Sequence, residues 1–197
     1  MGNLSSYKNQ NKQLDNQLDQ QFNWSEHNFT NTDNYTLNNQ KFICRVVDIY
    51  DGDTCICILP LYNSFYKFNI RLADIDTCEM KSKVEYNKNL ALLARMRLYE
   101  LIIGSKSNLD LEITRKDLRT ELNNNVYLIK LMCGEFDKYG RLLGWLFDNN
   151  DTDILLSHDK SFNHILINEK LAYLYNGKTK LTEDDQVNIL KIDHIND

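Results

Sequence analysis

The chain has 197 residues, of which 42% are hydrophobic and 26% are charged, a composition typical of a soluble globular protein with one domain and tails. Its formal net charge of -5 argues against a protein that binds nucleic acid through one large basic surface. The sequence contains neither an apolar run long enough to span a bilayer nor the pattern of a secretory signal peptide, so we expect an intracellular, cytoplasmic protein.

The charges are unevenly distributed along the chain. Residues 41–180 carry 20 of the 23 basic and 19 of the 28 acidic residues, so both ends of the chain are acidic. A nearly neutral middle segment with local arginines can bind a phosphate weakly and transiently, as an enzyme that must release its product requires. The five cysteines lack the spacing of a metal site, and we interpret all five as reduced thiols, most of which pack as small hydrophobic side chains.

Residues 1–40 are rich in Asn, Gln, Asp and Ser and show no periodicity. Such a segment cannot bury enough apolar surface to offset its ordering entropy, so we predict a disordered tail. Its first six residues fit the N-myristoylation pattern with Gly2 as acceptor, although short patterns of this kind also arise by chance. Because one acyl chain gives only marginal membrane binding, we expect at most a weak membrane association.

From Phe42 onward the pattern predicts alternating strands and helices. Three β-rich runs come first, with Asp51-Gly52 as a hairpin turn between the first two. An apolar stripe at helical spacing then predicts a helix that stops at Gly104. The predicted strands are 42–49, 53–59, 66–73, 126–133 and 141–147, with a further short strand at 109–114 inside a polar insertion of residues 105–125. The predicted helices are 83–103, 162–170 with Ser161 as its cap, and one near the end of the chain.

Five strands with one helix after the third and another after the fifth favour a small Greek-key barrel. We therefore predict an α+β, mainly β fold: a five-stranded barrel of the oligonucleotide-binding (OB) type with about three helices. The domain would span residues 41–180, followed by an acidic C-terminal tail at 181–197.

The stretch from Arg71 to Glu79 contains several candidate catalytic residues, with three carboxylates and one arginine in nine residues. Phosphodiester hydrolysis needs a cation that neutralises the phosphate, a carboxylate that orients or deprotonates water, and fixed positive charges at the transition state. Asp53 and Asp76 each lie at a predicted strand end, where they could form a hard, oxygen-lined site for Ca²⁺ or Mg²⁺. Arg71 could bind phosphate oxygens in a bidentate manner, and Arg141 could supply a second clamp.

Each of these pieces also has a purely structural explanation. Asp51-Gly52-Asp53 is typical of a turn, Arg71 could form a surface ion pair, and residues 138–141 could be a tight turn alone. The occurrence of all three in order, at strand ends, favours a metal-assisted site that cleaves phosphodiesters.

Three motifs carry a resemblance to a known family: Asp-Gly-Asp-Thr at 51–54, Arg-x-x-x-x-Asp-Thr-x-Glu at 71–79, and Asp-Lys-Tyr-Gly-Arg at 137–141. In this order and spacing the sequence resembles the staphylococcal nuclease (thermonuclease-like) family from Phe42 to Lys180. The resemblance implies an OB-type barrel and a Ca²⁺-dependent endonuclease. Such an enzyme cleaves DNA and RNA, prefers single strands and leaves 3′-phosphate ends.

The resemblance also implies roles for individual residues, which divide into metal ligands, catalytic groups and substrate contacts. By this resemblance, Asp53, Asp76 and the Thr77 carbonyl bind calcium. Arg71 and Arg141 are the phosphate clamps, and Glu79 is the general base. Lys138 and Tyr139 contact a neighbouring nucleotide phosphate.

The chain departs from the family pattern at Cys78, where the family usually has proline. The loss of proline removes a fixed φ angle from the loop that aims Glu79. The family's base-stacking tyrosine has no unambiguous counterpart, since Tyr173 and Tyr175 could stack on a base or pack in the core.

The sequence is compatible with two other functions. Barrels of this type also serve as catalytically silent modules that bind nucleic acid or protein. A third interpretation is a membrane-tethered interaction protein that acts through its N-terminal tail. The presence of all six polar groups of the family site favours the enzyme, which we expect to be a monomer.

Overall fold

The computed structural model describes residues 23–151 and 157–190, so the prediction for Gly2 lies outside the described residues. The chain divides into two compact units, residues 1–36 and 37–197. In the described part of the first unit, Trp24–Glu26 forms a 3₁₀ turn (η1) whose side chains are exposed.

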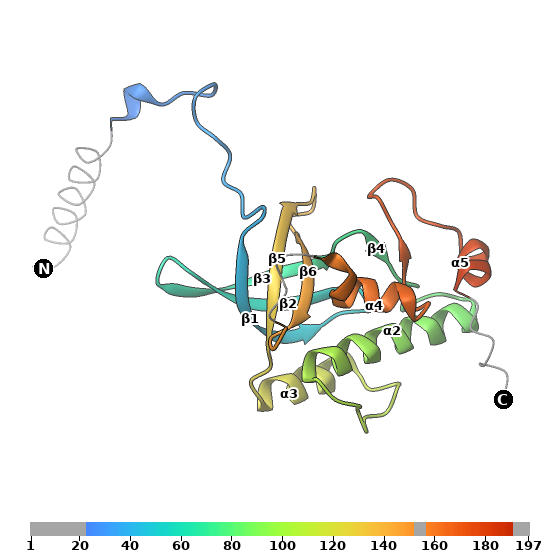
Figure 1. The fold of residues 1–197 in the computed structure, drawn as a ribbon. Helices are drawn as coiled ribbons and strands as arrows, with labels where there is room; N and C mark the ends of the chain where they lie inside the picture. The colour runs from blue at the N-terminus through green and yellow to red at the C-terminus, as the bar shows by residue number, and fades with distance from the viewer. Residues whose placement is uncertain (1–22, 152–156, 191–197) are drawn as a thin grey trace, which may run out of the picture. The chain divides into compact units, whose positions relative to one another are not determined.

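The second unit is built on a closed five-stranded barrel with the strand order β1-β2-β3-β6-β5 (Figure 1). Strands β3 and β6 pair in parallel, and the other four pairs are antiparallel. This arrangement confirms the predicted α+β fold with an OB-type barrel. The five strands are Lys41–Ile49 (β1), Thr54–Leu61 (β2), Ser64–Leu72 (β3), Leu128–Phe136 (β5) and Leu142–Asp148 (β6).

Alternation of side chains along the strands fills the barrel. In β2, Cys55, Cys57 and Leu59 point inward and are fully buried, while the residues between them are partly exposed. All five cysteines are buried free thiols, which confirms that they pack as small hydrophobic residues. Tight packing also explains Gly144 in β6, because a Cβ atom there would lie 2.5 Å from the Leu131 side chain.

Two predicted helices are confirmed. Helix α2 (Glu85–Ile103) buries its apolar stripe and ends at Gly104, whose φ of 70° is the left-handed conformation that glycine adopts most readily. Helix α4 (Phe162–Asn168) begins at Ser161, whose hydroxyl accepts a hydrogen bond from the backbone of His164. Helix α2 runs along the barrel and contacts α4 and α5 (Figure 1).

The polar insertion differs from the prediction. Residues 109–114 do not form a strand, and Arg115–Asn124 forms a helix, α3, so the described residues contain four α-helices instead of about three. Thr114 caps the helix by accepting a hydrogen bond from the Asp117 backbone, and Leu118 and Leu122 are buried. The helix has only two apolar positions in ten residues, so its sequence shows little helical periodicity.

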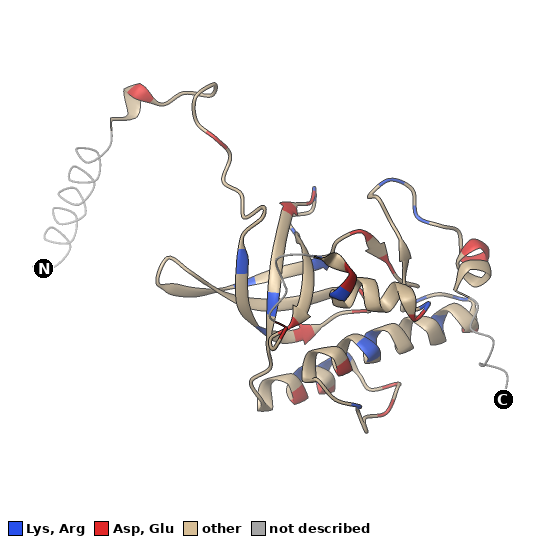
Figure 2. Ribbon diagram, in the orientation of Figure 1, with Lys and Arg blue, Asp and Glu red and all other residues tan. Residues whose placement is uncertain are grey.

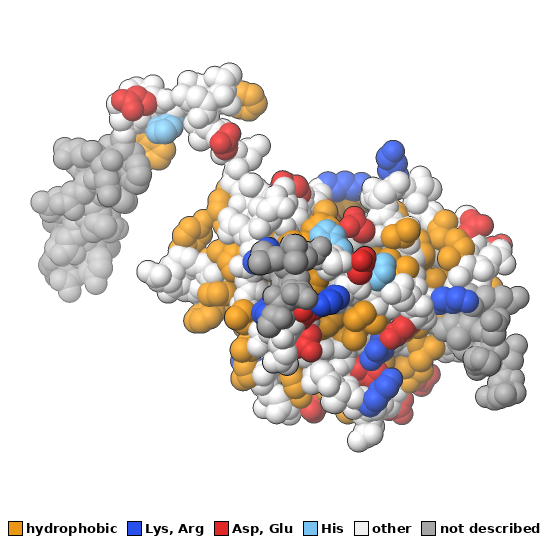
Figure 3. All heavy atoms as spheres, viewed as in Figure 1, with side chains coloured by type: hydrophobic (Ala, Val, Ile, Leu, Met, Phe, Trp, Pro, Cys, Tyr) orange, Lys and Arg blue, Asp and Glu red, His pale blue; other side chains and the backbone are white. Residues whose placement is uncertain are grey.

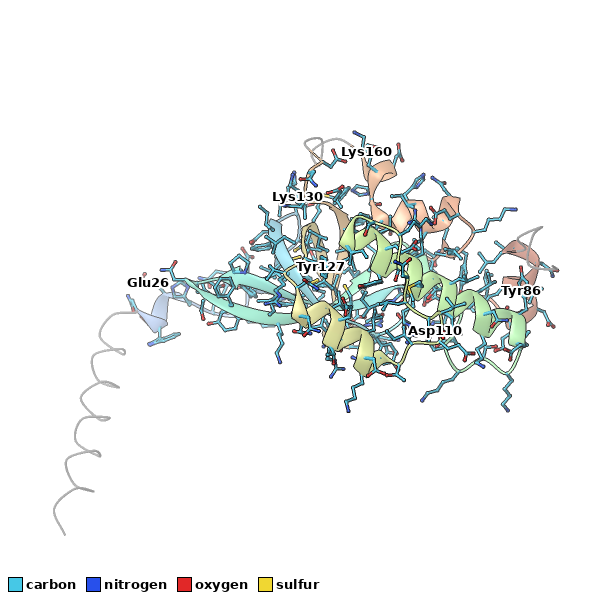
Figure 4. All side chains as sticks on the ribbon, turned by 90° about the horizontal axis from the view of Figure 1, so that it is seen from below. Glu26, Tyr86, Asp110, Tyr127, Lys130 and Lys160 are labelled. Carbon is cyan, nitrogen blue, oxygen red and sulfur yellow. The ribbon has the colours of Figure 1, made fainter. Side chains whose placement is uncertain are left out.

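The packed part of the chain extends beyond residues 41–180 at both ends. Leu37 is fully buried in the core, and the backbone of Asn39 donates to the Cys133 carbonyl at 2.8 Å. Within the acidic C-terminal segment, Glu183–Ile189 forms helix α5, which packs on α2. Figure 4 labels Tyr86 at this end of α2, where its hydroxyl donates to the Leu190 carbonyl at 3.3 Å. Among the described helices, none combines the length and apolar character that a membrane span requires.

Candidate active site

The turn between β1 and β2 positions Asp53 beside Arg71. In the antiparallel register of β2 and β3, Thr54 is opposite Arg71, and the Leu72 backbone donates to the Asp53 carbonyl at 2.8 Å. The Asp51 carboxylate holds the turn by accepting a hydrogen bond from the Asp53 backbone at 3.1 Å. Asp53 is therefore fixed by backbone contacts on both sides.

Gly52 in this turn is required by close packing. Its φ is not in the left-handed region, so conformational freedom does not explain the glycine. A Cβ atom at this position would lie 2.5 Å from the Ala94 Cβ of helix α2 and 3.0 Å from the Thr77 methyl group. The glycine thus lets the turn, the helix and the loop that carries Thr77 approach one another.

A two-stranded sheet positions the second aspartate. It consists of β4 (Ile75–Asp76) and β7 (Tyr173–Leu174), with Asp76 opposite Tyr173. The buried Tyr173 hydroxyl donates to Asp76 Oδ2 at 2.5 Å. Tyr173 is therefore a partner of the carboxylate and is not available to stack on a base. The Tyr175 side chain is partly exposed.

Arg71 is buried between the two aspartates. Its Nη1 lies 3.1 Å from Asp53 Oδ1 and its Nη2 lies 2.6 Å from Asp76 Oδ1, with all three side chains no more than 7% exposed. The alternative of a surface ion pair is therefore wrong. Arg71 faces away from the barrel interior, as its strand pattern predicted, but it contacts carboxylates instead of lining an open cleft.

Thr77 donates two hydrogen bonds to the Asp53 carboxylate. Its backbone N–H and its hydroxyl donate to Asp53 Oδ2 at 3.0 and 3.1 Å. The Thr54 hydroxyl donates to the other oxygen, Oδ1, at 2.9 Å. Both oxygens of Asp53 are thus hydrogen-bonded, and the loop after β4 is tied to the turn before β2.

Glu79 joins this group through Lys180, a residue that the sequence did not identify. Lys180 Nζ lies 2.7 Å from Glu79 Oε1 and 3.2 Å from Asp76 Oδ1. Glu79 is 63% exposed and Lys180 is 49% exposed, so this edge faces solvent. We define the carboxylate cluster as Asp53, Asp76 and Glu79 together with the cations Arg71 and Lys180.

The electrostatics of the cluster show negative charge that is only partly compensated. Burial raises the pKa of Asp53 to about 6, assisted by the nearby Asp51 carboxylate and opposed by Arg71. Burial also raises the pKa of Asp76, opposed by the hydrogen bond from Tyr173. A divalent cation at this position would stabilise both ionised aspartates.

Asp53 and Asp76 offer carboxylate oxygens, the ligand type that a hard cation such as Ca²⁺ prefers. Among the described residues, no group of three or more His, Cys, Asp or Glu side chains converges to hold a metal. Calcium also accepts backbone carbonyls and water, so Asp53, Asp76 and the Thr77 carbonyl would form part of a ligand set. Cys78 does not fit as a ligand, because it is buried and burial raises the pKa of its thiol to about 12.

The third motif forms the turn between β5 and β6. The Asp137 carboxylate accepts hydrogen bonds from the backbones of Tyr139 and Arg141, each at 2.9 Å, and Gly140 has a φ of 76°. The Arg141 guanidinium lies 2.8 Å from Asp137 Oδ2. These hydrogen bonds lower the pKa of Asp137 against the opposing effect of burial.

The parallel pairing of β3 with β6 relates this turn to Arg71. Arg71 is opposite Leu143, so Arg141, two residues earlier, immediately precedes β6, the strand next to that of Arg71. The Tyr139 ring is 73% exposed, with Lys138 Nζ 5.1 Å and Arg141 Cζ 5.7 Å from its centre. The structure therefore joins the first two motifs directly and places the third in the turn before the neighbouring strand, as an exposed basic and aromatic tip.

A pocket and a loop with two lysines lie near the β4–β7 pair. A pocket of about 420 Å³ lies beside the β4–β7 pair. The loop between β7 and α5 carries Lys178 and Lys180 and is marked blue in Figure 2. On the face shown in Figure 3, acidic and basic side chains are interspersed. The lining of the pocket consists of Asp74, Tyr173, Leu174, Tyr175, Asn176, Thr179 and Leu181.

A comparison with protein families finds a match over most of the barrel domain. The family described as "Staphylococcal nuclease homologue" matches residues 69–194, well over half of the chain. The matched region includes the motifs at 71–79 and 137–141, and it begins after Asp53. No curated protein matches the chain.

Proposed function

Because the chain belongs to the family of staphylococcal nuclease homologues, we propose that it is a Ca²⁺-dependent endonuclease that hydrolyses phosphodiester bonds of DNA or RNA. We propose single strands as its preferred substrate and 3′-phosphate ends as its products. The observation that carries this proposal is the pair of buried aspartates, 4% and 1% exposed, that share one buried arginine. A surplus of buried carboxylates is costly in a purely structural cluster and useful in a cation site.

In this proposal the residues of the site divide into metal ligands, a general base and a fixed positive charge. Asp53, Asp76 and the Thr77 carbonyl bind the metal, which supplies charge neutralisation and a site for water when bound. Glu79 accepts a proton from water, since its exposed side chain can turn toward the substrate. Arg71 contributes charge from inside the cluster.

The exposed tip and the pocket would contact the nucleic acid around the scissile bond. Arg141 would exchange its bond to Asp137 for a phosphate oxygen. Lys138 and Tyr139 would contact a neighbouring phosphate from the same turn. The pocket beside Tyr175 has a volume in the range of small-molecule sites and could receive one nucleotide.

The test is cleavage of denatured DNA by the purified protein, with Ca²⁺ and with a calcium chelator. We expect cleavage only with Ca²⁺, a loss of at least about a hundredfold in Glu79→Ser, and little change in the matched control Glu85→Ser, another exposed glutamate. Arg71→Lys should fold but lose most turnover, because a lysine ammonium cannot contact Asp53 and Asp76 through two separate nitrogen atoms as the guanidinium does. A folded wild-type protein that binds single strands without cutting them would favour the silent binding module.

We propose that the first unit serves location and not catalysis, through a weak membrane contact if Gly2 is acylated. Removing residues 2–36 should then leave cleavage unchanged. The deletion stops before Leu37 because that side chain is buried in the core. A truncated protein that folds but does not cleave would overturn this division of roles.

A further inference from the structure

Three donors occupy the two oxygens of Asp76. Arg71 Nη2 and Lys180 Nζ both contact Oδ1, at 2.6 and 3.2 Å, and the Tyr173 hydroxyl contacts Oδ2. Each carboxylate oxygen has two lone pairs, and Oδ1 of Asp76 already has two cationic partners, so a metal ion that binds through Oδ1 must displace Arg71 or Lys180. The question is which of the donors around Asp76 can leave at the lowest cost.

Two of the donors are held in place by other contacts. Arg71 is 7% exposed, and its Nη1 also contacts Asp53 Oδ1 and the Leu72 carbonyl, both at 3.1 Å. Tyr173 is 4% exposed, and its backbone is paired in the β4–β7 sheet. The departure of either donor would leave a buried polar group without its partner.

Lys180 differs from both in its freedom to move. Its side chain is 49% exposed, and it belongs to the loop between β7 and α5. When its ammonium leaves Asp76, it enters water instead of the protein interior, so the hydration that it regains offsets the lost ion pairs. The same movement frees Glu79, whose Oε1 it contacts at 2.7 Å.

On the premise of the proposed calcium site, we propose that Lys180 is a built-in competitor for the divalent cation. In the metal-free protein its ammonium holds Asp76 and Glu79 together. Metal binding displaces it, which releases Glu79 at the same time. Lys180 therefore sets the calcium affinity of the site and couples metal binding to the release of Glu79.

Calcium titration of the full chain without nucleic acid tests this role by isothermal titration calorimetry. We expect Lys180→Met to bind Ca²⁺ at least about tenfold more tightly than the wild type, because one positive charge no longer occupies the site. The control is Lys178→Met, an exposed lysine of the same loop, which should bind within about twofold of the wild type. Both variants remove one positive charge, so a difference between them is local.

The outcomes separate the two proposals. Equal or weaker calcium binding by folded Lys180→Met would overturn the competitor role and leave the calcium site intact. Absence of calcium binding in the folded wild type and both variants would overturn the calcium site itself, and the competitor role with it. Damage to the fold would weaken binding, so it cannot imitate the expected gain. A second variant, Lys180→Gln, should show the same gain.

Discussion

The domain contains two clusters of buried carboxylates and basic side chains, and they differ in which charge is in surplus. In the carboxylate cluster, three carboxylates face Arg71 and Lys180, and the aspartates are almost fully buried. In the second cluster, the buried Asp48 carboxylate contacts two arginines of α3, and we call these three residues the Asp48 cluster. Arg115 Nη2 lies 2.6 Å and Arg119 Nη2 lies 2.7 Å from Asp48 Oδ2.

The location of the surplus charge separates a structural cluster from a candidate site. The arginines of the Asp48 cluster are 36% and 50% exposed, so water hydrates their extra charge, and Arg115 also stacks on Tyr50 at 4.6 Å. This cluster joins α3 to β1, and its charges require no additional ion. In the carboxylate cluster the surplus is negative and partly buried, so a cation from solution can lower its energy.

The strongest test of this contrast removes the central cation of the carboxylate cluster. Arg71→Met leaves two buried aspartates without their main partner, and we expect a loss of about 3–5 kcal/mol in the free energy of unfolding without metal. Asp48→Asn should cost less, about 1–2 kcal/mol, because the arginines it leaves are already half hydrated. Urea unfolding in a chelator measures both, and saturating Ca²⁺ should restore stability only to Arg71→Met. Equal losses with no calcium effect would contradict the contrast.

The stability of the metal-free protein should depend on pH through the protonation of Asp53. Its pKa is about 6 in the folded protein, against about 3.9 in an unfolded chain, so the folded state holds the proton more tightly. This stabilisation is complete below about pH 4 and is lost as pH rises to about 6, a change of about 3 kcal/mol in the metal-free protein. The difference in stability between the wild type and Asp53→Asn, measured by urea unfolding from pH 4 to 7, should show this slope. Parallel curves would rule it out.

A smaller effect should follow from packing at the turn that carries Asp53. Gly52→Ala would place a methyl group against the Ala94 Cβ, and overpacking of this kind costs about 1–3 kcal/mol. Thermal unfolding should show the loss, and the second substitution Ala94→Gly should recover part of it by removing the opposing methyl group. Additive losses in the double variant would show that the two residues do not compete for the same space.

The smallest effect belongs to the outer arginine of the Asp48 cluster. Arg119→Gln should cost less than about 1 kcal/mol, because the side chain is half exposed and Asp48 keeps both hydrogen bonds from Arg115. Arg115→Gln should cost more, since it also removes the contact with Tyr50. Urea unfolding of the two variants gives the order, and the reverse order would show that Arg119 is the main partner.

The barrel could be predicted from the sequence because its strands alternate between buried and exposed side chains. Helix α2 was equally clear, since its apolar stripe is long and Gly104 ends it. Helix α3 was not predicted because it is mostly polar and has only two buried leucines. Thr114 and Asp117 form a capping pattern from which the start of the helix could have been predicted.

The residues of the candidate site that belong to short sequence motifs could be predicted. Asp53, Arg71 and Asp76 meet because adjacent strand ends bring them together, as the pattern indicated. Lys180 gave no signal, because it is 101 positions from Glu79 and comes from a loop without a motif. The reason for Gly52 was also hidden, since the neighbour that requires it is on a helix far along the chain.

The pairing of Asp76 with Tyr173 also fixes the order in which the molecule can be completed. Biosynthesis proceeds from the N-terminus, and all five barrel strands have been made once residue 148 is reached. Tyr173 and Lys180 follow only later, so a nascent chain can close its barrel before Asp76 acquires two of its three partners. The carboxylate cluster can therefore be completed only after residues 173–180 have been made, later in synthesis than the five strands of the barrel.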